Sequence, residues 1–404
     1  MLAGFRILDL SDERGHLAGK ILGDMGADVI KVEPPGGDPL RRRAPFLGGL
    51  EDPERGLAWL AHNTSKRGIT LDLAPLAGRA LFSRLVARAD VVLESFAPGT
   101  MEGWGVGWEI LSAENPSLVY CAITPFGRTG PYADYAAHDL VTVALGGNAS
   151  MTGDADRPPV RCSLPTAYFH AAPEAALGIV MALYARDAGG PGQLVDVSMQ
   201  ECQVATLLSG VGQYERRGAL GVRAGARLGR TREIWPAADG FVTFGLRGGH
   251  ARTKNLIATV EYMAECGMAP DWLRELDWSS YRPEQLSVGE LDRLEAAFGA
   301  FFESRTMGEL YEQALRRRIL LAPCNDPAAV LAHPQLRDRE LFVEVESPDP
   351  QVQLEQPSFF ARAGKDGIAI RRRAPRLGEH NDEVYGELGI GSGQLAELRD
   401  EGAL

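Results

Sequence analysis

The sequence predicts an α/β fold, and two observations carry the prediction. Short apolar strands alternate with amphipathic helices through the first half of the chain, and the strands are too apolar to face water. Strands are expected at 5–10, 29–33, 69–73, 91–94 and 118–123, with helices at 17–25, 76–89 and 108–114. Alternation at this spacing gives a parallel sheet covered on both faces, so we expect a Rossmann-like large domain.

The length of the chain predicts more than one domain. At 404 residues it exceeds the size at which a single core keeps growing. Residues 221–232 are rich in Gly and Arg and are typical of a linker. We therefore expect the first part of the large domain at 1–220, a linker and smaller α+β domain at 221–330, and a return segment to the large domain at 331–404.

Composition excludes several classes of protein. The net charge of −12 disfavours nonspecific binding to nucleic acid, and no apolar run approaches the ~18 residues of a membrane span. Residues 1–9 lack the order of a secretion signal, so a cytoplasmic location is expected. The five cysteines form no Cys-x-x-Cys pair, which argues against a metal site. The first turn, 11–16, is not Gly-x-Gly-x-x-Gly, so a nicotinamide cofactor is disfavoured.

Groups able to move a proton gather between residues 118 and 174. His138 and Asp139 precede the apolar run 140–145, and a second apolar segment, 160–167, leads to Tyr168 and His170. Both segments follow the end of the last expected strand, the region where open α/β sheets bind ligands. The candidate catalytic residues are His138, Tyr168 and His170.

Several ordered blocks resemble the class III CoA-transferases (CaiB/BaiF type), a family that includes α-methylacyl-CoA racemase and the carnitine and formyl-CoA transferases. The blocks are GADVIKVEPPGGD (26–38), NTSKRGITLDL (63–73), DVVLESFAPG (90–99), FGRTGP (126–131), VDVS (195–198), AHPQ (332–335) and PRLGEH (375–380). The resemblance runs from end to end. It implies a protein that acts on acyl-CoA and a carboxylic acid, a Rossmann-like domain with a small domain, and two chains interlocked as rings.

The resemblance also locates the nucleophile of the family, and this chain departs from it there. The family pattern runs Pro-Val-Arg, small residues, Pro, two residues, Asp, whereas here Pro165 is followed by Thr166, Ala167 and Tyr168. In the transferases that carboxylate attacks the thioester and forms a mixed anhydride, then an enzyme-bound CoA thioester. A phenol with an ordinary pKa near ~10 is protonated at neutral pH and cannot form an anhydride. The usual route therefore cannot run on Tyr168.

CoA phosphates need fixed positive charge or backbone donors, and the sequence offers several cations. Arg14 lies in the first turn, Arg41 and Arg42 follow the first block, and Lys66 and Arg67 precede the strand expected at 69–73. For the cluster at 41–43 a solvated loop is an equal alternative. The matching blocks add Leu71, Ser95, Phe96 and Arg128 to the residues expected to bind CoA.

Three functions remain open. The first is CoA transfer to a carboxylic acid, in a homodimer or a heteromer in which a related chain supplies the aspartate. The second is α-epimerisation of an acyl-CoA through an enolate, with His138 as base, since the racemases of the family carry a histidine one segment upstream of the aspartate. In that case Tyr168 is a donor or second base, whereas the structural alternative is that His138 caps the following helix. The third is a non-catalytic CoA-binding subunit.

Overall fold

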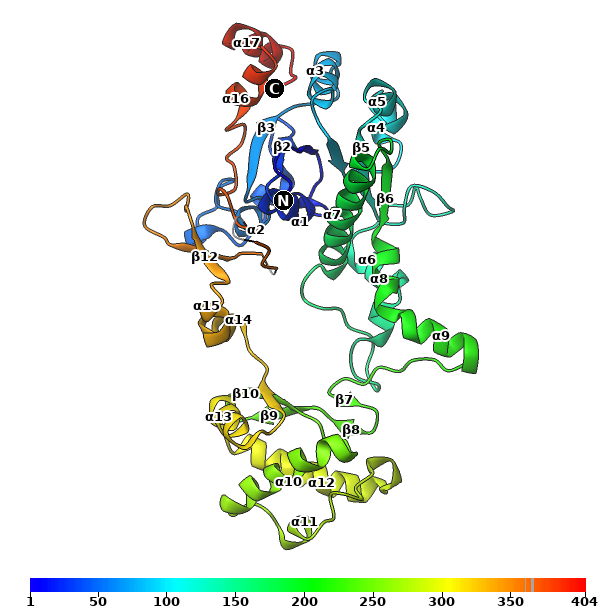
Figure 1. Ribbon diagram of the computed structural model, residues 1–404, viewed down its shortest axis with the longest axis vertical. Helices are drawn as coiled ribbons and strands as arrows, with labels where there is room; N and C mark the ends of the chain where they lie inside the picture. Colours follow the sequence, from blue (N-terminus) through cyan, green and yellow to red (C-terminus); the bar gives the residue numbers. More distant parts are fainter. Residues whose placement is uncertain (360, 365–366) are drawn as a thin grey trace. The chain divides into compact units, whose positions relative to one another are not determined.

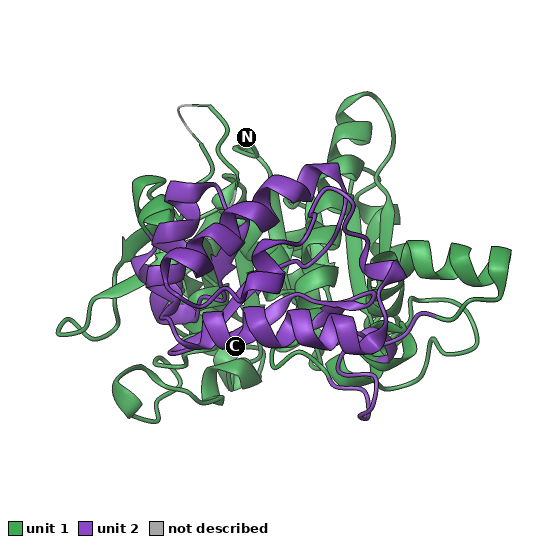
Figure 2. Ribbon diagram, turned by 90° about the horizontal axis from the view of Figure 1, so that it is seen from below, with its two compact units in different colours: residues 1–149, 161–220, 334–404 green, residues 150–160, 221–333 purple. Residues whose placement is uncertain are grey.

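The computed structural model describes residues 1–359, 361–364 and 367–404, so that residues 360, 365 and 366 of the expected return segment lie outside the described residues. The chain divides into two units, which Figure 2 draws in different colours. Unit 1 consists of residues 1–149, 161–220 and 334–404, and unit 2 of residues 150–160 and 221–333. The chain thus leaves unit 1 and returns to it, and the loop 150–160 groups with unit 2.

Unit 1 is built on a six-stranded sheet with the strand order β3-β2-β1-β4-β5-β6, in which every neighbouring pair is parallel. The strands are β1 (Arg6–Asp9), β2 (Asp28–Glu33), β3 (Lys66–Thr70), β4 (Val91–Glu94), β5 (Val119–Thr124) and β6 (Leu194–Ser198). The inner strands β4 and β5 are buried at every residue, as expected in a parallel sheet that is covered on both faces. The edge strand β3 is also buried at every residue. The predicted α/β fold is confirmed.

Different helices cover the two faces of this sheet (Figure 1). Ile7 packs with α1 (His16–Asp24) and the long helix α7 (Thr166–Asp187), whereas its neighbour Leu8 packs with α3 (Leu76–Val86) on the opposite face. Adjacent residues of a strand point to opposite faces, which explains this division. The second face is completed by α5 (Trp108–Glu114), α16 (Asn381–Glu387) and α17 (Ser392–Asp400).

The return segment protects the free edge of β3. Ser65 N–H donates to the carbonyl of Arg372 at 2.9 Å, and the backbone N–H of His380 donates to the carbonyl of Gly68 at 2.9 Å. Gly68 is required here because a Cβ would lie 2.8 Å from the Cβ of Pro375. An uncovered edge strand would present unpaired backbone groups, so the segment satisfies them and blocks pairing with other chains.

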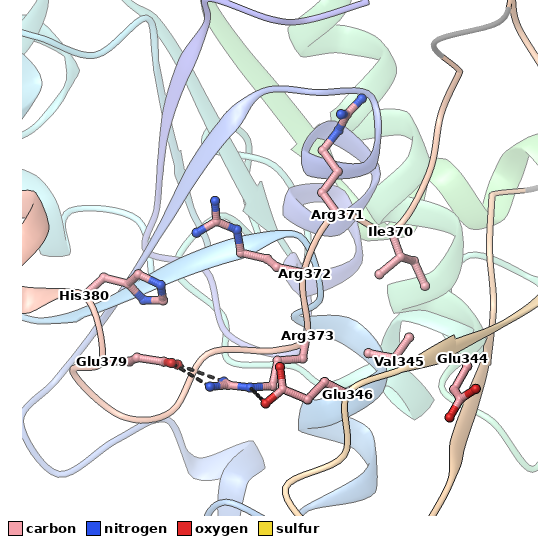
Figure 3. A pocket seen from close by; sticks show the side chains of 9 residues that line it. All are labelled: Glu344, Val345, Glu346, Ile370, Arg371, Arg372, Arg373, Glu379 and His380. Atoms are coloured by element: carbon pink, nitrogen blue, oxygen red, sulfur yellow. Dashed lines mark hydrogen bonds and ion pairs between the residues drawn. The ribbon is translucent and has the colours of Figure 1, made fainter.

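A cavity of about 510 Å³ lies beside this segment (Figure 3). Arg373 binds Glu379 and Glu346, while the side chains of Arg371 and Arg372 extend away from those carboxylates. The full lining is Glu344, Val345, Glu346, Ile370, Arg371, Arg372, Arg373, Glu379 and His380. No lining residue comes from the carboxyl ends of the six parallel strands, which is where a sheet of this kind binds its substrate.

Unit 2 is the smaller α+β domain that the sequence predicts. Its sheet has the order β11-β10-β9 and consists of β9 (Ile234–Ala237), β10 (Gly240–Phe244) and β11 (Leu321–Pro323). The helices α10 (His250–Glu265), α11 (Asp271–Arg274), α12 (Val288–Glu303) and α13 (Met307–Arg317) belong to the same unit. Its core is aromatic, with Trp235, Phe244, Phe298, Phe301 and Phe302 fully enclosed.

The remaining elements are shorter. They are α2 (Leu57–His62), α4 (Thr100–Gly103), α6 (Asp139–Leu145), α8 (Met199–Val204), α9 (Leu208–Arg217), α14 (Pro327–Ala332), α15 (Pro334–Asp338), β7 (Arg227–Leu228), β8 (Thr231–Arg232), β12 (Phe342–Val345), β13 (Leu354–Pro357) and the 3₁₀ turns η1 (Pro39–Arg42), η2 (Leu47–Gly49), η3 (Asn148–Met151), η4 (Ala205–Leu207) and η5 (Pro283–Gln285). Among the described residues, no helix has both the length and the apolar character that crossing a bilayer requires.

Candidate active site

The candidate site lies where α6 and α7 begin, near the turn that follows β1. The two helices are joined at their first turns by a pair of reciprocal bonds. Asp139 Oδ1 accepts from the backbone N–H of Ala167 at 2.8 Å, and the backbone N–H of Asp139 donates to the Tyr168 hydroxyl oxygen at 3.2 Å. The sequence predicts an apolar segment at 160–167 that leads to Tyr168. In the structure α7 already begins at Thr166, so Tyr168 lies within its first turn.

Tyr168 is 7% exposed, and burial raises the pKa of its phenol. The negative charges of Glu13 and Asp12 raise this pKa further, while the Asp139 N–H bond and the Arg14 guanidinium lower it. The net direction is upward, so the phenol is protonated at neutral pH. Because its oxygen already accepts from Asp139, the O–H remains able to donate to another group.

The turn between β1 and α1 forms the wall beside Tyr168. Arg14 binds the carboxylate of Asp12 through both Nε and Nη2, the latter at 2.7 Å. Ser95 O–H donates to Asp12 Oδ1 at 2.9 Å and Ser95 Oγ accepts from the Asp12 N–H at 2.8 Å. Glu13 pairs with Arg43. The structure therefore brings Arg14 and Ser95, both predicted CoA contacts, to the same turn as two carboxylates.

Arg128 and Glu94 form a second charged group at this edge. Arg128 Nη1 lies 3.4 Å from Glu94 Oε1, and its Nη2 pairs with Glu102. Glu94 is 2% exposed, and burial raises its pKa to about 7, against the lowering effects of the Phe96 N–H and of Arg128. Phe96 itself packs edge-on against Trp104, with ring centroids 5.2 Å apart.

The raised pKa of Glu94 predicts a pH dependence of stability. The folded state holds the proton more tightly than the unfolded state, so stabilisation is complete below pH 4.5 and is lost as pH rises towards about 7. Glu94→Gln keeps an acceptor but cannot ionise. In this variant the free energy of unfolding should lose on the order of 3 kcal/mol of its change between pH 4.5 and about 7. Urea unfolding at intervals of pH measures it. Parallel curves for wild type and variant would contradict the assignment.

The two candidate histidines lie on different sides of α7. His138 is the exposed N-cap residue of α6, but its side chain makes no capping hydrogen bond. His170 Nδ1 lies 2.9 Å from Gln203 Nε2, and therefore faces α8. Residues two apart on a helix point in directions about 200° apart, so His170 does not join Tyr168. His138 directly precedes Asp139, and the backbone N–H of Asp139 donates to the Tyr168 hydroxyl oxygen.

Three of the predicted CoA-binding cations are occupied by protein groups. All three donors of Lys66 are used, by Asp9, the His16 carbonyl and Asn63. Arg67 pairs with Asp28, Glu383 and Glu387. Arg41, 1% exposed, binds Glu33 and Glu54 and lies 3.8 Å above the Trp59 ring. Arg42 is exposed and donates to the Gly36 carbonyl, and Leu71 is a core residue.

Sequence reasoning missed His62 and Glu13. The His62 ring meets Phe169, the neighbour of Tyr168, edge-on at 5.8 Å. Burial lowers the pKa of His62 to about 4, with the positive charges of His16 and Lys66 adding to the effect. His62 lies one residue before the second block and Glu13 within the first turn, but neither follows a pattern that marks a site.

A parallel sheet with polar groups near the start of two helices is typical of α/β proteins that bind a substrate. Comparison with known proteins identifies the family of this chain. A sequence model described as CoA-transferase family III matches residues 2–381. The chain is 33% identical to the succinyl-CoA:(R)-benzylsuccinate CoA-transferase subunit BbsE of Thauera aromatica, covering 99% of this chain and 97% of that protein. It is also 33% identical to the succinyl-CoA–D-citramalate CoA-transferase of Chloroflexus aurantiacus, covering 95% and 93%.

A solved structure agrees with these relatives. The crystal structure of a CaiB/BaiF family protein from Brucella suis covers 96% of this chain and 99% of its own, with a TM-score of 0.82 and 29% identity. The chain belongs to CoA-transferase family III. The predicted family and enzyme class are confirmed, while the role of Tyr168 stays a prediction. Relatives named alpha and beta subunits of a succinyl-CoA–L-malate CoA-transferase are 28% and 29% identical to this chain.

Proposed function

We propose that this protein takes part in the transfer of CoA from an acyl-CoA to a carboxylic acid, as one subunit of an assembly in which a related chain supplies the nucleophilic aspartate. The observation that carries the proposal is the buried, protonated phenol of Tyr168 where the family resemblance expects a carboxylate. The names of the relatives favour succinyl-CoA as donor and an organic acid as acceptor. The names of several of them as subunits favour a heteromer.

The residues of the site divide into two roles under this proposal. Tyr168 donates its O–H to the thioester oxygen, where negative charge develops as a nucleophile attacks. Arg14, Arg42 and Arg128 supply positive charge to the CoA phosphates, since each keeps an exposed or partly exposed guanidinium. Lys66, Arg41 and Arg67 support the loops around the site instead, because they are buried as well as bound to protein groups.

The experiment compares three preparations with succinyl-CoA and a panel of dicarboxylic acids. They are this chain alone, an aspartate-bearing family member alone, and the two chains co-expressed. CoA transfer that requires both chains, or that rises strongly when both are present, supports the proposal. Transfer by this chain alone contradicts it, and the absence of transfer and of CoA binding in the co-expressed pair favours a non-catalytic subunit.

One observation favours a second function, enolate chemistry on an acyl-CoA. His138 is exposed, its side chain does not cap α6, and it is adjacent to the residue whose backbone binds Tyr168. A free imidazole near a phenolic donor suits removal of an α-proton. Incubation of the chain with acyl-CoA in deuterated water tests this function. Exchange at the α-carbon that His138→Ala abolishes would establish it, and a lack of exchange would reject it.

Helix α9 supports the proposed assembly. None of its residues is buried, although three of them are large and apolar: Leu208, Val211 and Tyr214 are 72%, 57% and 59% exposed. A spacing of three places these side chains on one face of the helix. A helix of ten residues is marginal in water without tertiary packing. We therefore propose that a related chain covers this face.

Charge on the apolar face should disrupt that assembly. The double variant Leu208→Glu/Tyr214→Glu is expected to remain folded, because it changes exposed residues, and to lose the partner chain by at least about 100-fold in affinity. Gln213→Glu adds one negative charge on the opposite face and is the matched control. Sedimentation of the co-expressed pair measures the effect, and an unchanged complex would rule out α9 as the contact surface.

A further inference from the structure

A buried ion pair lies beneath the turn that faces Tyr168. Lys66 Nζ and Asp9 Oδ2 are 2.8 Å apart, and both side chains are 0% exposed. Lys66 is the first residue of β3 and Asp9 the last of β1, two strands that are separated by β2. The Lys66 side chain thus spans the width of β2, on the face of the sheet that α1 covers, to reach the start of the turn. Removing two charges from water is costly, so the pair needs a compensating role or full hydrogen bonding.

The same ammonium group also binds the other end of the turn. Lys66 Nζ donates to the His16 carbonyl at 2.8 Å and to Asn63 Oδ1 at 2.8 Å. His16 is the first residue of α1, so the Asp9 carboxylate and the His16 carbonyl delimit the turn 10–15. One cation therefore holds both ends of this turn.

The neighbouring groups restrict the turn further. Asp9 Oδ1 accepts from Ser11 N–H at 3.0 Å and from Ser11 O–H at 2.6 Å, and Lys31 donates to the Ser11 carbonyl. His16 is held on its other side, with Nε2 donating to Asp38 at 3.1 Å. All five of these side chains are buried, so water does not compete for the bonds.

We call Lys66, with its bonds to Asp9, the His16 carbonyl and Asn63, the clamp. The clamp holds the turn that forms the wall of the candidate site. Residues 12–14 lie between its two ends, and their charges act on the Tyr168 phenol. We propose that Lys66 is a positioning residue, whose ammonium group fixes both ends of the β1–α1 turn and thereby holds Asp12, Glu13 and Arg14 beside Tyr168. The proposal gives the second sequence block, in which Lys66 lies, a role beneath the site in place of contact with phosphate. Its consequence for CoA binding rests on the proposed function.

Gly19 provides a separate way to disturb the clamp. A Cβ at this position would lie 2.2 Å from Asp9 Oδ2 and 2.9 Å from Lys66 Nζ. The close approach of α1 to the ion pair thus requires glycine at a helical position where Ala has the better propensity. Gly19→Ala should push the pair apart without removing either charge. Gly289→Ala, in a helix where a Cβ meets nothing within 4 Å, is the matched control.

The test separates positioning from simple neutralisation of a buried charge. Lys66→Met leaves Asp9 unpaired and is expected to destabilise the protein, whereas Asp9→Asn/Lys66→Met removes both charges and should restore stability in urea. The readout of position is the ¹⁹F spectrum of the full chain with 3-fluorotyrosine at position 168, which requires no ligand. A calorimetric titration with CoA is the second readout.

We expect the double variant and Gly19→Ala to shift or broaden the ¹⁹F resonance and to weaken CoA binding by about 10-fold, because small misplacements of binding groups are costly. Gly289→Ala should match wild type in both readouts. A stable double variant with the wild-type resonance would overturn the proposal and leave Lys66 as a neutralising charge. If the wild-type chain binds no CoA, the proposed function fails and the ¹⁹F comparison still decides the role of Lys66.

Discussion

Replacement of Arg41 by methionine is expected to lower the free energy of unfolding by about 3–5 kcal/mol. Arg41 donates to Glu33 through Nε at 2.6 Å and through Nη2 at 2.8 Å, and the Glu33 side chain is 0% exposed. The variant therefore leaves an uncompensated carboxylate in the core. It also removes a bond to the Pro375 carbonyl, which ties the return segment to the sheet, and the stacking over Trp59. Urea denaturation measures the loss.

The neighbouring residue supplies the control. Arg42 is exposed and, within the described part of the chain, donates to a single group, the carbonyl of Gly36, so Arg42→Met should change the free energy of unfolding by less than about 0.5 kcal/mol. The double variant Glu33→Gln/Arg41→Met removes both charges and should recover a large part of the loss. Equal effects at positions 41 and 42 would show that the buried pair does not stabilise the fold.

Tyr168→Asp is expected to give this chain a nucleophile of its own. The new carboxylate would stand at the start of α7, next to Asp139 and facing Arg14. Loss of a covalent nucleophile costs up to about 10⁶-fold in a protease, so the return of one, even imperfectly placed, should raise CoA transfer by about 100-fold or more. In Tyr168→Asn the new side chain has the size of aspartate without its charge, so the rate of CoA transfer should stay at the wild-type level.

The assay for this pair of variants is single-turnover transfer from succinyl-CoA, with covalent CoA on the protein followed by mass spectrometry. An adduct on the aspartate variant that is absent from the asparagine variant supports the account. If both variants behave alike, the position does not carry the chemistry, and the resemblance to the transferase pattern misplaces the site.

Most of the strands were predictable because they are apolar runs of the right length, and β5 agrees closely with the expected 118–123. The third strand was expected at 69–73, but β3 spans Lys66–Thr70 and begins with two buried cations. The start of α7 was not predictable in the same way. Residues 160–167 were interpreted as one apolar segment, but α7 already begins at Thr166 and continues through Pro173. Proline favours the first turn of a helix, so the sequence favours a later start. This shift places Tyr168 and His170 on the same helix, where they face different directions.

The cations were harder to predict because their partners are remote in the sequence. Arg67 pairs with Glu383 and Glu387, more than 300 residues away, and Lys66 is enclosed by Asp9, His16 and Asn63. A sequence shows where charges are but not which are neutralised after folding. The resemblance assigns Tyr168 to a position in the family pattern, and that assignment stays a prediction. The burial that raises the pKa of Tyr168 emerges only from packing.

The central claim is that this chain by itself forms no covalent intermediate with acyl-CoA. Intact-protein mass spectrometry of the purified wild-type chain, after incubation with succinyl-CoA, tests it most directly. The account predicts the unmodified mass at every time point. A mass increase that peptide mapping assigns to any carboxylate of the site, Glu13 above all, would contradict it.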